Sequence, residues 1–94
     1  MTFVAYAILD NTGNVAYIGQ TNDIKRRQSE HKRDYRKPLY DFVNSLNNFQ
    51  LLPLAYANTR QEILERESYL IDFYLASGCN LKNSLLVTNG KGLQ

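Results

Sequence analysis

The sequence lacks the features that mark secreted and membrane proteins. Its single cysteine, Cys79, cannot form an internal disulfide, which favours a reducing, intracellular environment. No apolar run is long enough to cross a bilayer, and no basic segment precedes an apolar stretch at the N-terminus. Linkers, repeats and low-complexity tracts are missing as well. We therefore expect one cytoplasmic domain with no membrane partner.

Net charge is also small, at +2, but it is unevenly distributed along the 94 residues. Residues 25–37 carry seven basic and two acidic residues, whereas residues 62–72 carry four acidic residues and one basic residue. A basic helix suggests a polyanionic partner, and an acidic helix suggests a place to hold a cation. Solvated helix faces explain both segments as well, so charge alone does not decide between these interpretations.

Turn, capping and periodicity signals predict a small α+β domain with the element order β-β-α-α-β-α. The turn residues Asp10-Asn11-Thr12-Gly13 separate two apolar runs that are strand candidates. Asn22 or Asp23 can cap a first helix, and Pro38 ends it and opens a second. A later strand contains a proline, which argues for an edge strand, and a capping box opens the last helix. The expected sheet is three-stranded and antiparallel, with strands over 2–9, 14–19 and 49–57, and helices from 23 towards 36, over 39–46 and from 60 to 78.

The length of the first turn predicts how the first two strands pair. With a four-residue turn, Leu9 pairs with Asn14, and Tyr6 lies directly opposite Tyr17. Side chains directly opposite in an antiparallel pair share a face and are about 5 Å apart at Cβ. The sequence therefore predicts that the two phenols are neighbours on one face of the sheet. Tyrosines are also favoured in strands for packing reasons alone, which is the alternative.

Three ionisable side chains fall on the apolar stripes of two predicted helices. Arg27 and His31 share the stripe of Ile24, and Glu67 lies on the stripe of Ile63 in the last helix. A charge on a core-facing stripe destabilises the fold unless it is paired or binds a metal ion. One interpretation is a buried Arg27–Glu67 salt bridge with His31 in the core. The other is a cleft in which Arg27 binds a phosphate and Glu67 binds a metal ion.

Five motifs, in order, resemble those of the GIY-YIG endonuclease family. Residues 4–6 stand where the family has Gly-Ile-Tyr, although only the tyrosine is kept, and Tyr17-Ile18-Gly19 is the second motif intact. Residues 22–27 are similar to the helix that supplies the family's arginine, 65–72 to its glutamate helix, and 78–81 to the motif with its functional asparagine. The resemblance covers about residues 3–81 and implies a three-stranded antiparallel sheet with flanking helices. It divides the chain into a nuclease domain over 1–81 and a tail over 82–94, docked or partly mobile.

The resemblance implies metal-dependent hydrolysis of a DNA phosphodiester. It assigns one Mg²⁺ or Mn²⁺ to Glu67 and the phosphate to Arg27. Tyr6 is the first choice as general base, with His31 assisting and Tyr17 as orienting group or reserve base. Asn80 positions the site or the substrate. The side chains expected to grip backbone phosphates are Lys25, Arg26, Lys32, Arg33, Arg36 and Lys37.

Three functions are open at this point: an active DNA nuclease, a DNA-binding module that does not cut, and a catalytic module that borrows its specificity. The full residue set argues against the second. The length of 94 residues leaves no space for a separate DNA-reading domain, so we expect low sequence specificity and a phage or mobile-element source. Borrowed specificity comes from a partner protein or from a homodimer, for which Leu85-Leu86-Val87 is the candidate contact.

Overall fold

The computed structural model describes residues 2–83. The expectations for a docked tail and for a dimer contact at Leu85-Leu86-Val87 lie outside the described residues. Those described form three strands and three helices in the predicted order, β-β-α-α-β-α. The strands are β1 (Phe3–Leu9), β2 (Val15–Thr21) and β3 (Leu52–Ala57), and the helices are α1 (Ile24–Arg33), α2 (Tyr40–Asn44) and α3 (Arg60–Ala76).

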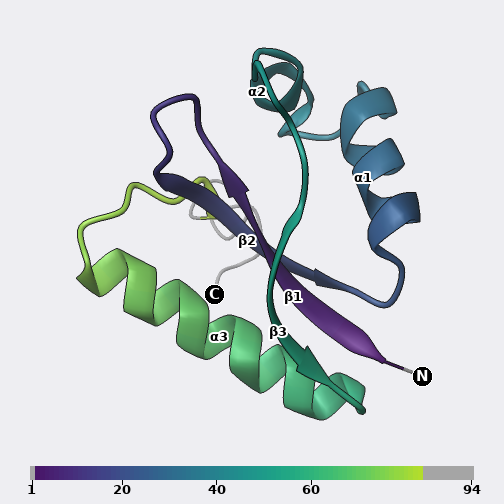
Figure 1. The fold of residues 1–94 in the computed structure, drawn as a ribbon, viewed down its shortest axis with the longest axis vertical. Coiled ribbons are helices and arrows are strands. Elements are labelled where there is room, and N and C mark those ends of the chain that lie inside the picture. Colours follow the sequence, from purple (N-terminus) through teal and green to yellow (C-terminus); the bar gives the residue numbers. More distant parts are fainter. Residues whose placement is uncertain (1, 84–94) are drawn as a thin grey trace.

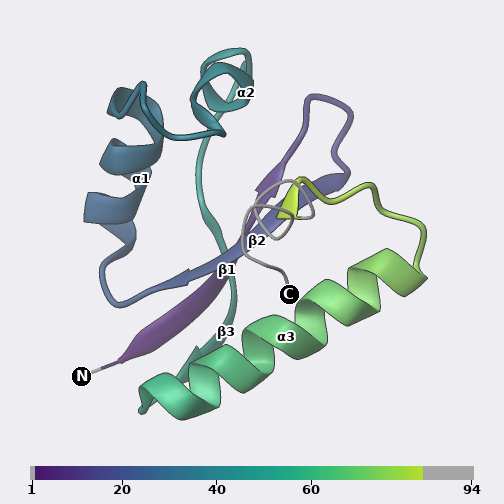
Figure 2. The same ribbon diagram turned by 180° about the vertical axis from the view of Figure 1, so that it is seen from behind.

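The sheet is antiparallel, with β1 in the centre of the order β2-β1-β3. The predicted fold class is therefore confirmed, and β3 is an edge strand, as its proline predicts. Figure 1 shows α1 and α2 together on one side of the sheet and α3 on the other, and Figure 2 shows the same separation from behind. Alternation along β1 explains these layers, because successive side chains of a strand point to opposite faces. Tyr6 and Ile8 pack with Val43 of α2, whereas Ala5 and Ala7 belong to the clusters that contain residues of α3.

The helices α1 and α3 begin at the predicted caps, but α1 ends early. The side chains of Asp23 and Thr59 each accept a backbone N–H from the first turn of α1 and α3, respectively. α1 was expected to continue towards Arg36 and instead stops at Arg33. The reason is Asp34, whose carboxylate accepts the backbone N–H of Arg36 and so competes with helical hydrogen bonding.

β3 begins at Leu52, later than expected, because the residues before it turn towards α1. The ring of Phe49 lies against His31, with ring centroids 6.4 Å apart. The Leu51 N–H donates to Oε1 of Gln28 over 3.2 Å. Residues 49–51 therefore pack beneath α1 and α2 and do not extend the ladder with β1.

The first hairpin turns differently from the four-residue turn that was predicted. The Asp10 N–H donates to the Asn14 carbonyl, and Gly13 adopts a left-handed conformation with φ 89°, which makes a three-residue loop. Further along, a β-bulge leaves Ala16 without a partner on β1. Each of the two changes shifts the pairing by one residue. Since a one-residue shift swaps the faces of a strand, two such shifts restore the original face.

This register corrects the position of Tyr17 but keeps its predicted face. Tyr6 is opposite Gly19, and Tyr17 is opposite Ile8, so the direct Tyr6–Tyr17 pair is wrong. The two tyrosines are diagonal neighbours on the face covered by α1 and α2, with ring centroids 6.3 Å apart. Their predicted proximity on one sheet face is therefore confirmed.

Candidate active site

Three aromatic side chains from β1, β2 and α1 meet on the sheet face that α1 covers. Tyr6 is fully buried, and its hydroxyl oxygen lies 2.8 Å from Nε2 of His31, which is itself only 5% exposed. The ring of Tyr17 lies beside both, and its centroid is 5.9 Å from that of His31. We call these three residues the Tyr6–Tyr17–His31 cluster. The sequence predicted this meeting of two phenols and an imidazole, and the structure confirms it.

Gly19 leaves the space that the cluster needs. A Cβ atom at residue 19 would lie 2.5 Å from the Tyr6 hydroxyl oxygen and 2.9 Å from Cε2 of Tyr17. The Tyr6 ring therefore crosses directly over the glycine of the opposite strand on its way to His31. This close approach explains why a glycine follows Tyr17-Ile18, a requirement that the sequence alone does not reveal.

Gly19→Ala is expected to displace Tyr6 from His31 and to destabilise the fold. Adding a methyl group to a packed interior typically costs about 1–3 kcal/mol. For a domain of this size, that loss corresponds to a fall in melting temperature of roughly 5–20 °C. Thermal unfolding followed by circular dichroism measures the change, and a variant that melts with the wild type would contradict the close approach.

Burial controls the protonation of the cluster. It raises the pKa of the Tyr6 phenol, and Tyr17 adds to the rise, whereas Arg27 opposes it through its charge and a hydrogen bond. Burial also raises the pKa of Tyr17, with a further rise from the charge of Glu67. Burial, followed by the charge of Arg27, lowers the pKa of His31 to about 4. At neutral pH both phenols keep their protons and the imidazole is neutral, so we infer that the Tyr6 hydroxyl donates to Nε2 of His31.

The protein is expected to lose stability as the pH falls below the ordinary histidine pKa of about 6.5. The fold disfavours the imidazolium of His31, so the unfolded chain takes up the proton first, and folding weakens until the pH reaches the folded-state pKa of about 4. The full shift corresponds to about 3 kcal/mol. Urea unfolding of the wild type and of His31→Gln across this range measures it. The variant should lack this part of the acid sensitivity, and equal losses in both would contradict the assignment.

Arg27 and Glu67 come from helices on opposite sides of the sheet, α1 and α3, and both influence the cluster through their charges. The side chain of Arg27 is 31% exposed, and its Nε lies 3.1 Å from Oε1 of Glu30. Burial raises the pKa of Glu67, and the charge of Arg27 opposes that rise. The charges of Arg27 and Glu67 both act on Tyr6 and Tyr17. Within residues 2–83 no ion pair joins Arg27 to Glu67, so the structure does not contain the buried salt bridge of the first interpretation.

Comparison with known families agrees with this arrangement. A family model described as the GIY-YIG catalytic domain matches residues 2–82. The chain belongs to the GIY-YIG family. No curated protein and no solved structure gave a significant match. Membership of the GIY-YIG family implies nuclease activity on DNA, and GIY-YIG nucleases generally depend on a divalent metal ion.

The asparagine predicted from the last GIY-YIG-like motif lies apart from the cluster. Asn80 is exposed and lines a hollow of about 260 Å³ beside the first hairpin, and no contact described for residues 2–83 joins it to Tyr6 or His31. Asn83 instead binds the outer edge of β2. Its Oδ1 accepts the Ile18 N–H at 2.9 Å, and its Nδ2 donates to the Ile18 carbonyl at 2.7 Å. Asn83 was not predicted from the sequence, because its role depends on which strand edge the fold leaves open.

The residues predicted to grip DNA form an exposed basic surface on α1 and the turn after it. Several line two shallow hollows of about 450 and 320 Å³ along this helix. Arg26 and Arg36 are paired with Glu30 and Asp34, whereas the lysines and Arg33 form no ion pair in the described part of the chain. All six of these basic side chains are exposed: Lys25, Arg26, Lys32, Arg33, Arg36 and Lys37.

None of the described helices combines the length and apolarity that a membrane crossing requires.

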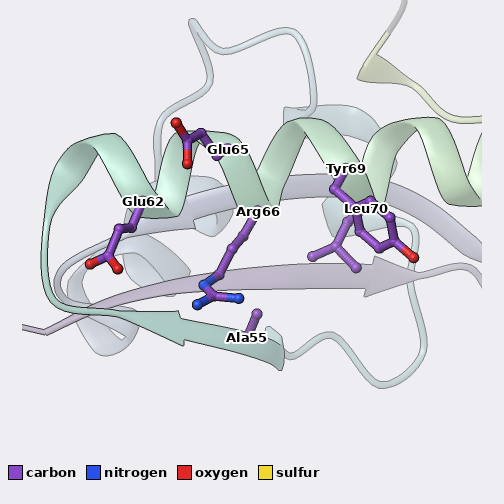
Figure 3. Close-up of a pocket in the computed structure, with 6 residues that line it drawn as sticks. All are labelled: Ala55, Glu62, Glu65, Arg66, Tyr69 and Leu70. Carbon is purple, nitrogen blue, oxygen red and sulfur yellow. The ribbon is translucent and has the colours of Figure 1, made fainter.

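A further hollow, of about 420 Å³, lies between α3 and β3 (Figure 3). Arg66 extends from α3 across it towards Ala55 of β3, while Glu65 points away from the strand. None of the predicted site residues lines this hollow, and its two glutamates are poorly suited to a phosphate. We therefore place the candidate site at the Tyr6–Tyr17–His31 cluster. The residues around the hollow are Ala55, Glu62, Glu65, Arg66, Tyr69 and Leu70.

Proposed function

We propose that this protein is a metal-dependent endonuclease that hydrolyses DNA phosphodiester bonds with little sequence specificity of its own. The observation that carries the proposal is the 2.8 Å hydrogen bond between the Tyr6 hydroxyl and His31. The charges of Arg27 and Glu67 both act on the Tyr6 phenol of this pair. General acid–base chemistry needs a proton acceptor held in such a contact. Phosphoryl chemistry also needs a cation beside the phosphate and a carboxylate for a metal ion. In this proposal Tyr6 and His31 handle the proton, Arg27 is the cation and Glu67 is the carboxylate.

Glu67 fits the metal ion that the family implies. Its carboxylate is partly buried, and burial raises its pKa, which means that a cation beside it would relieve an unfavourable charge. No group of three or more acidic, histidine or cysteine side chains occurs in residues 2–83 that could enclose an ion. Mg²⁺ suits a single carboxylate, because it usually keeps several waters and binds substrate phosphates. Bound there, the ion would polarise the phosphate and stabilise the leaving oxygen.

The cluster provides a route for the proton of the attacking water. Once DNA binding admits a water to the hydroxyl of Tyr6, which is buried in the unbound structure, the water's proton moves to the Tyr6 oxygen while Tyr6 passes its own proton to Nε2 of His31, so no free phenolate forms. This route suits a phenol whose pKa is raised by burial. The imidazolium that results is disfavoured by burial, but the negative charge of a bound phosphate opposes that effect. Tyr17 serves as orienting group or reserve base.

Arg27 binds the phosphate in this proposal, and the basic surface of α1 holds the DNA. A guanidinium can donate two parallel hydrogen bonds to phosphate oxygens and stabilise the charge that grows on them. The exposed lysines and arginines contact backbone phosphates, which carry no sequence information. Asn80, exposed beside the first hairpin, is assigned to the substrate rather than to the reacting atoms. A phage or mobile-element source and a cytoplasmic location stay predictions.

One Arg27 and one Glu67 make one scissile-phosphate site per chain, so the protein is expected to nick one strand at a time. Incubation with supercoiled plasmid and Mg²⁺ should yield open circles before linear product, with no cleavage in EDTA. DNA affinity should fall steeply with salt, since phosphate contacts release counterions. Linear DNA with a unique end from the start would contradict the nicking monomer and favour a dimer, which sedimentation at several protein concentrations would detect.

A further inference from the structure

Glu30 is placed unusually for an acidic residue on a DNA-binding helix. It lies in the middle of α1, whose surface is otherwise basic. Its carboxylate contacts two arginines of the preceding turn: Oε1 is 3.1 Å from Nε of Arg27, and Oε2 is 3.6 Å from Nε of Arg26. A negative charge at this point repels the DNA backbone, so a purely electrostatic DNA-binding surface would be better without it.

The two contacts of Glu30 differ in their surroundings. The Arg26 side chain is 53% exposed, and water can solvate it in place of the carboxylate. Nε of Arg27 is buried and has no hydrogen-bond partner in the described residues, because its N–H does not point at the carboxylate even though the two are close. The charge of Glu30 is therefore what compensates this buried nitrogen.

The guanidinium of Arg27 also acts on Tyr6. Burial raises the pKa of Tyr6, and the guanidinium of Arg27 opposes that rise, so its charge acts on the phenol. The Arg27 side chain as a whole is 31% exposed although its Nε is buried, so Arg27 is not closed off from solvent. A guanidinium is planar and rigid, so an ion contact that keeps Nε in place also keeps its terminal donors in place.

We propose that Glu30 is a positioning residue, which holds Arg27 at Nε so that its terminal nitrogens face the Tyr6 hydroxyl and the scissile phosphate. The same carboxylate weakens DNA binding, so Glu30 improves turnover at the expense of affinity. The proposal rests on the proposed function, since it gives Arg27 the phosphate.

The chain offers a matched control in Asp34. This carboxylate is the other acidic group between residues 25 and 37, and it pairs with Nε of Arg36 at 3.0 Å. The Arg36 side chain is 78% exposed, and no contact described for residues 2–83 links Asp34 to Arg27. Glu30→Gln and Asp34→Asn therefore remove the same charge from the same surface, but only the first acts on Arg27.

The test compares DNA binding with single-turnover cleavage. Binding to a short duplex, measured in EDTA, should tighten by a similar few-fold factor in both variants. At saturating DNA with Mg²⁺, Glu30→Gln should cleave about 10- to 100-fold more slowly than wild type, as expected for a misplaced catalytic group, whereas Asp34→Asn should cleave at the wild-type rate. Equal rates in all three proteins, or the same loss in both variants, would overturn the proposal and leave the nuclease assignment intact. If the wild type does not cleave, the nuclease assignment itself fails.

A second measurement does not depend on cleavage. The arginine Nε–H signals are recorded by NMR, and that of Arg27 is identified by its loss in Arg27→Lys. Its exchange with solvent should be slow in the wild type and in Asp34→Asn, because Nε is buried. It should become fast in Glu30→Gln. A signal that stays equally protected in Glu30→Gln would show that Glu30 does not hold Arg27.

Discussion

Glu67→Gln is expected to abolish cleavage while DNA binding is kept or becomes tighter. Glutamine keeps the shape of the side chain but removes the charge that would hold the metal ion. Since a metal ion can contribute several kcal/mol to the transition state of phosphoryl transfer, the loss should be about 10³-fold or more. Removing a negative charge also relieves repulsion from the DNA phosphates. Plasmid nicking in Mg²⁺ and duplex binding in EDTA measure the two effects separately.

The control for this substitution is Glu65→Gln on the same helix. Glu65 is exposed and accepts a hydrogen bond from Gln61, away from the cluster. The Glu65→Gln variant should nick plasmid at the wild-type rate. Nicking by Glu67→Gln at a comparable rate would exclude the metal role.

Thermal stability distinguishes a metal ligand from a structural ion pair at Glu67. The fold raises the pKa of this carboxyl by burial, which means that the ionised form is destabilising and that the penalty grows as the pH rises through that pKa. A neutral glutamine should therefore melt at the wild-type temperature or above it at neutral pH. A marked fall would instead indicate that Arg27 depends on Glu67 as a buried partner.

Tyr6→Phe is expected to lower the cleavage rate by about 10²- to 10⁴-fold, the range typical of losing a general base. Phenylalanine keeps the ring over Gly19 but removes the hydroxyl that contacts His31 at 2.8 Å. Single-turnover cleavage at saturating DNA measures the loss. Binding in EDTA should change little, because Tyr6 is fully buried.

Tyr17→Phe is the matched comparison for Tyr6→Phe. Both phenols are largely buried, and burial raises the pKa of each, but only Tyr6 is hydrogen-bonded to His31 among the described contacts. The Tyr17 variant should therefore lose much less activity. The opposite order of losses would make Tyr17 the general base.

Loss of the Tyr6 hydroxyl also has a structural effect that can be measured independently. Nε2 of His31 would be left buried without its partner, which typically costs about 1–3 kcal/mol. Both tyrosine variants should be followed by thermal unfolding, so that a drop in activity is separated from a drop in folded protein.

Local sequence signals determined the elements and their order. Asp23 and Thr59 begin the helices because short polar side chains satisfy free N–H groups close to them in the chain, and the proline of the third strand is tolerated only at a sheet edge. The helical stripes likewise identified Arg27, His31 and Glu67, since helical geometry repeats every few residues. These features depend on neighbours in sequence, so they can be read without the fold.

The tertiary structure decided what depends on distant partners. The hairpin register needed two single-residue shifts, and the face of Tyr17 came out as predicted because a total shift of two residues returns a side chain to its original face. The clearance above Gly19 and the clamp of Asn83 on Ile18 depend on strands brought together from different parts of the chain. The tertiary structure also decided that Arg27 pairs with Glu30 and not with Glu67. Pairing depends on the distance between the two side chains and on their burial, and neither can be read from spacing along the sequence.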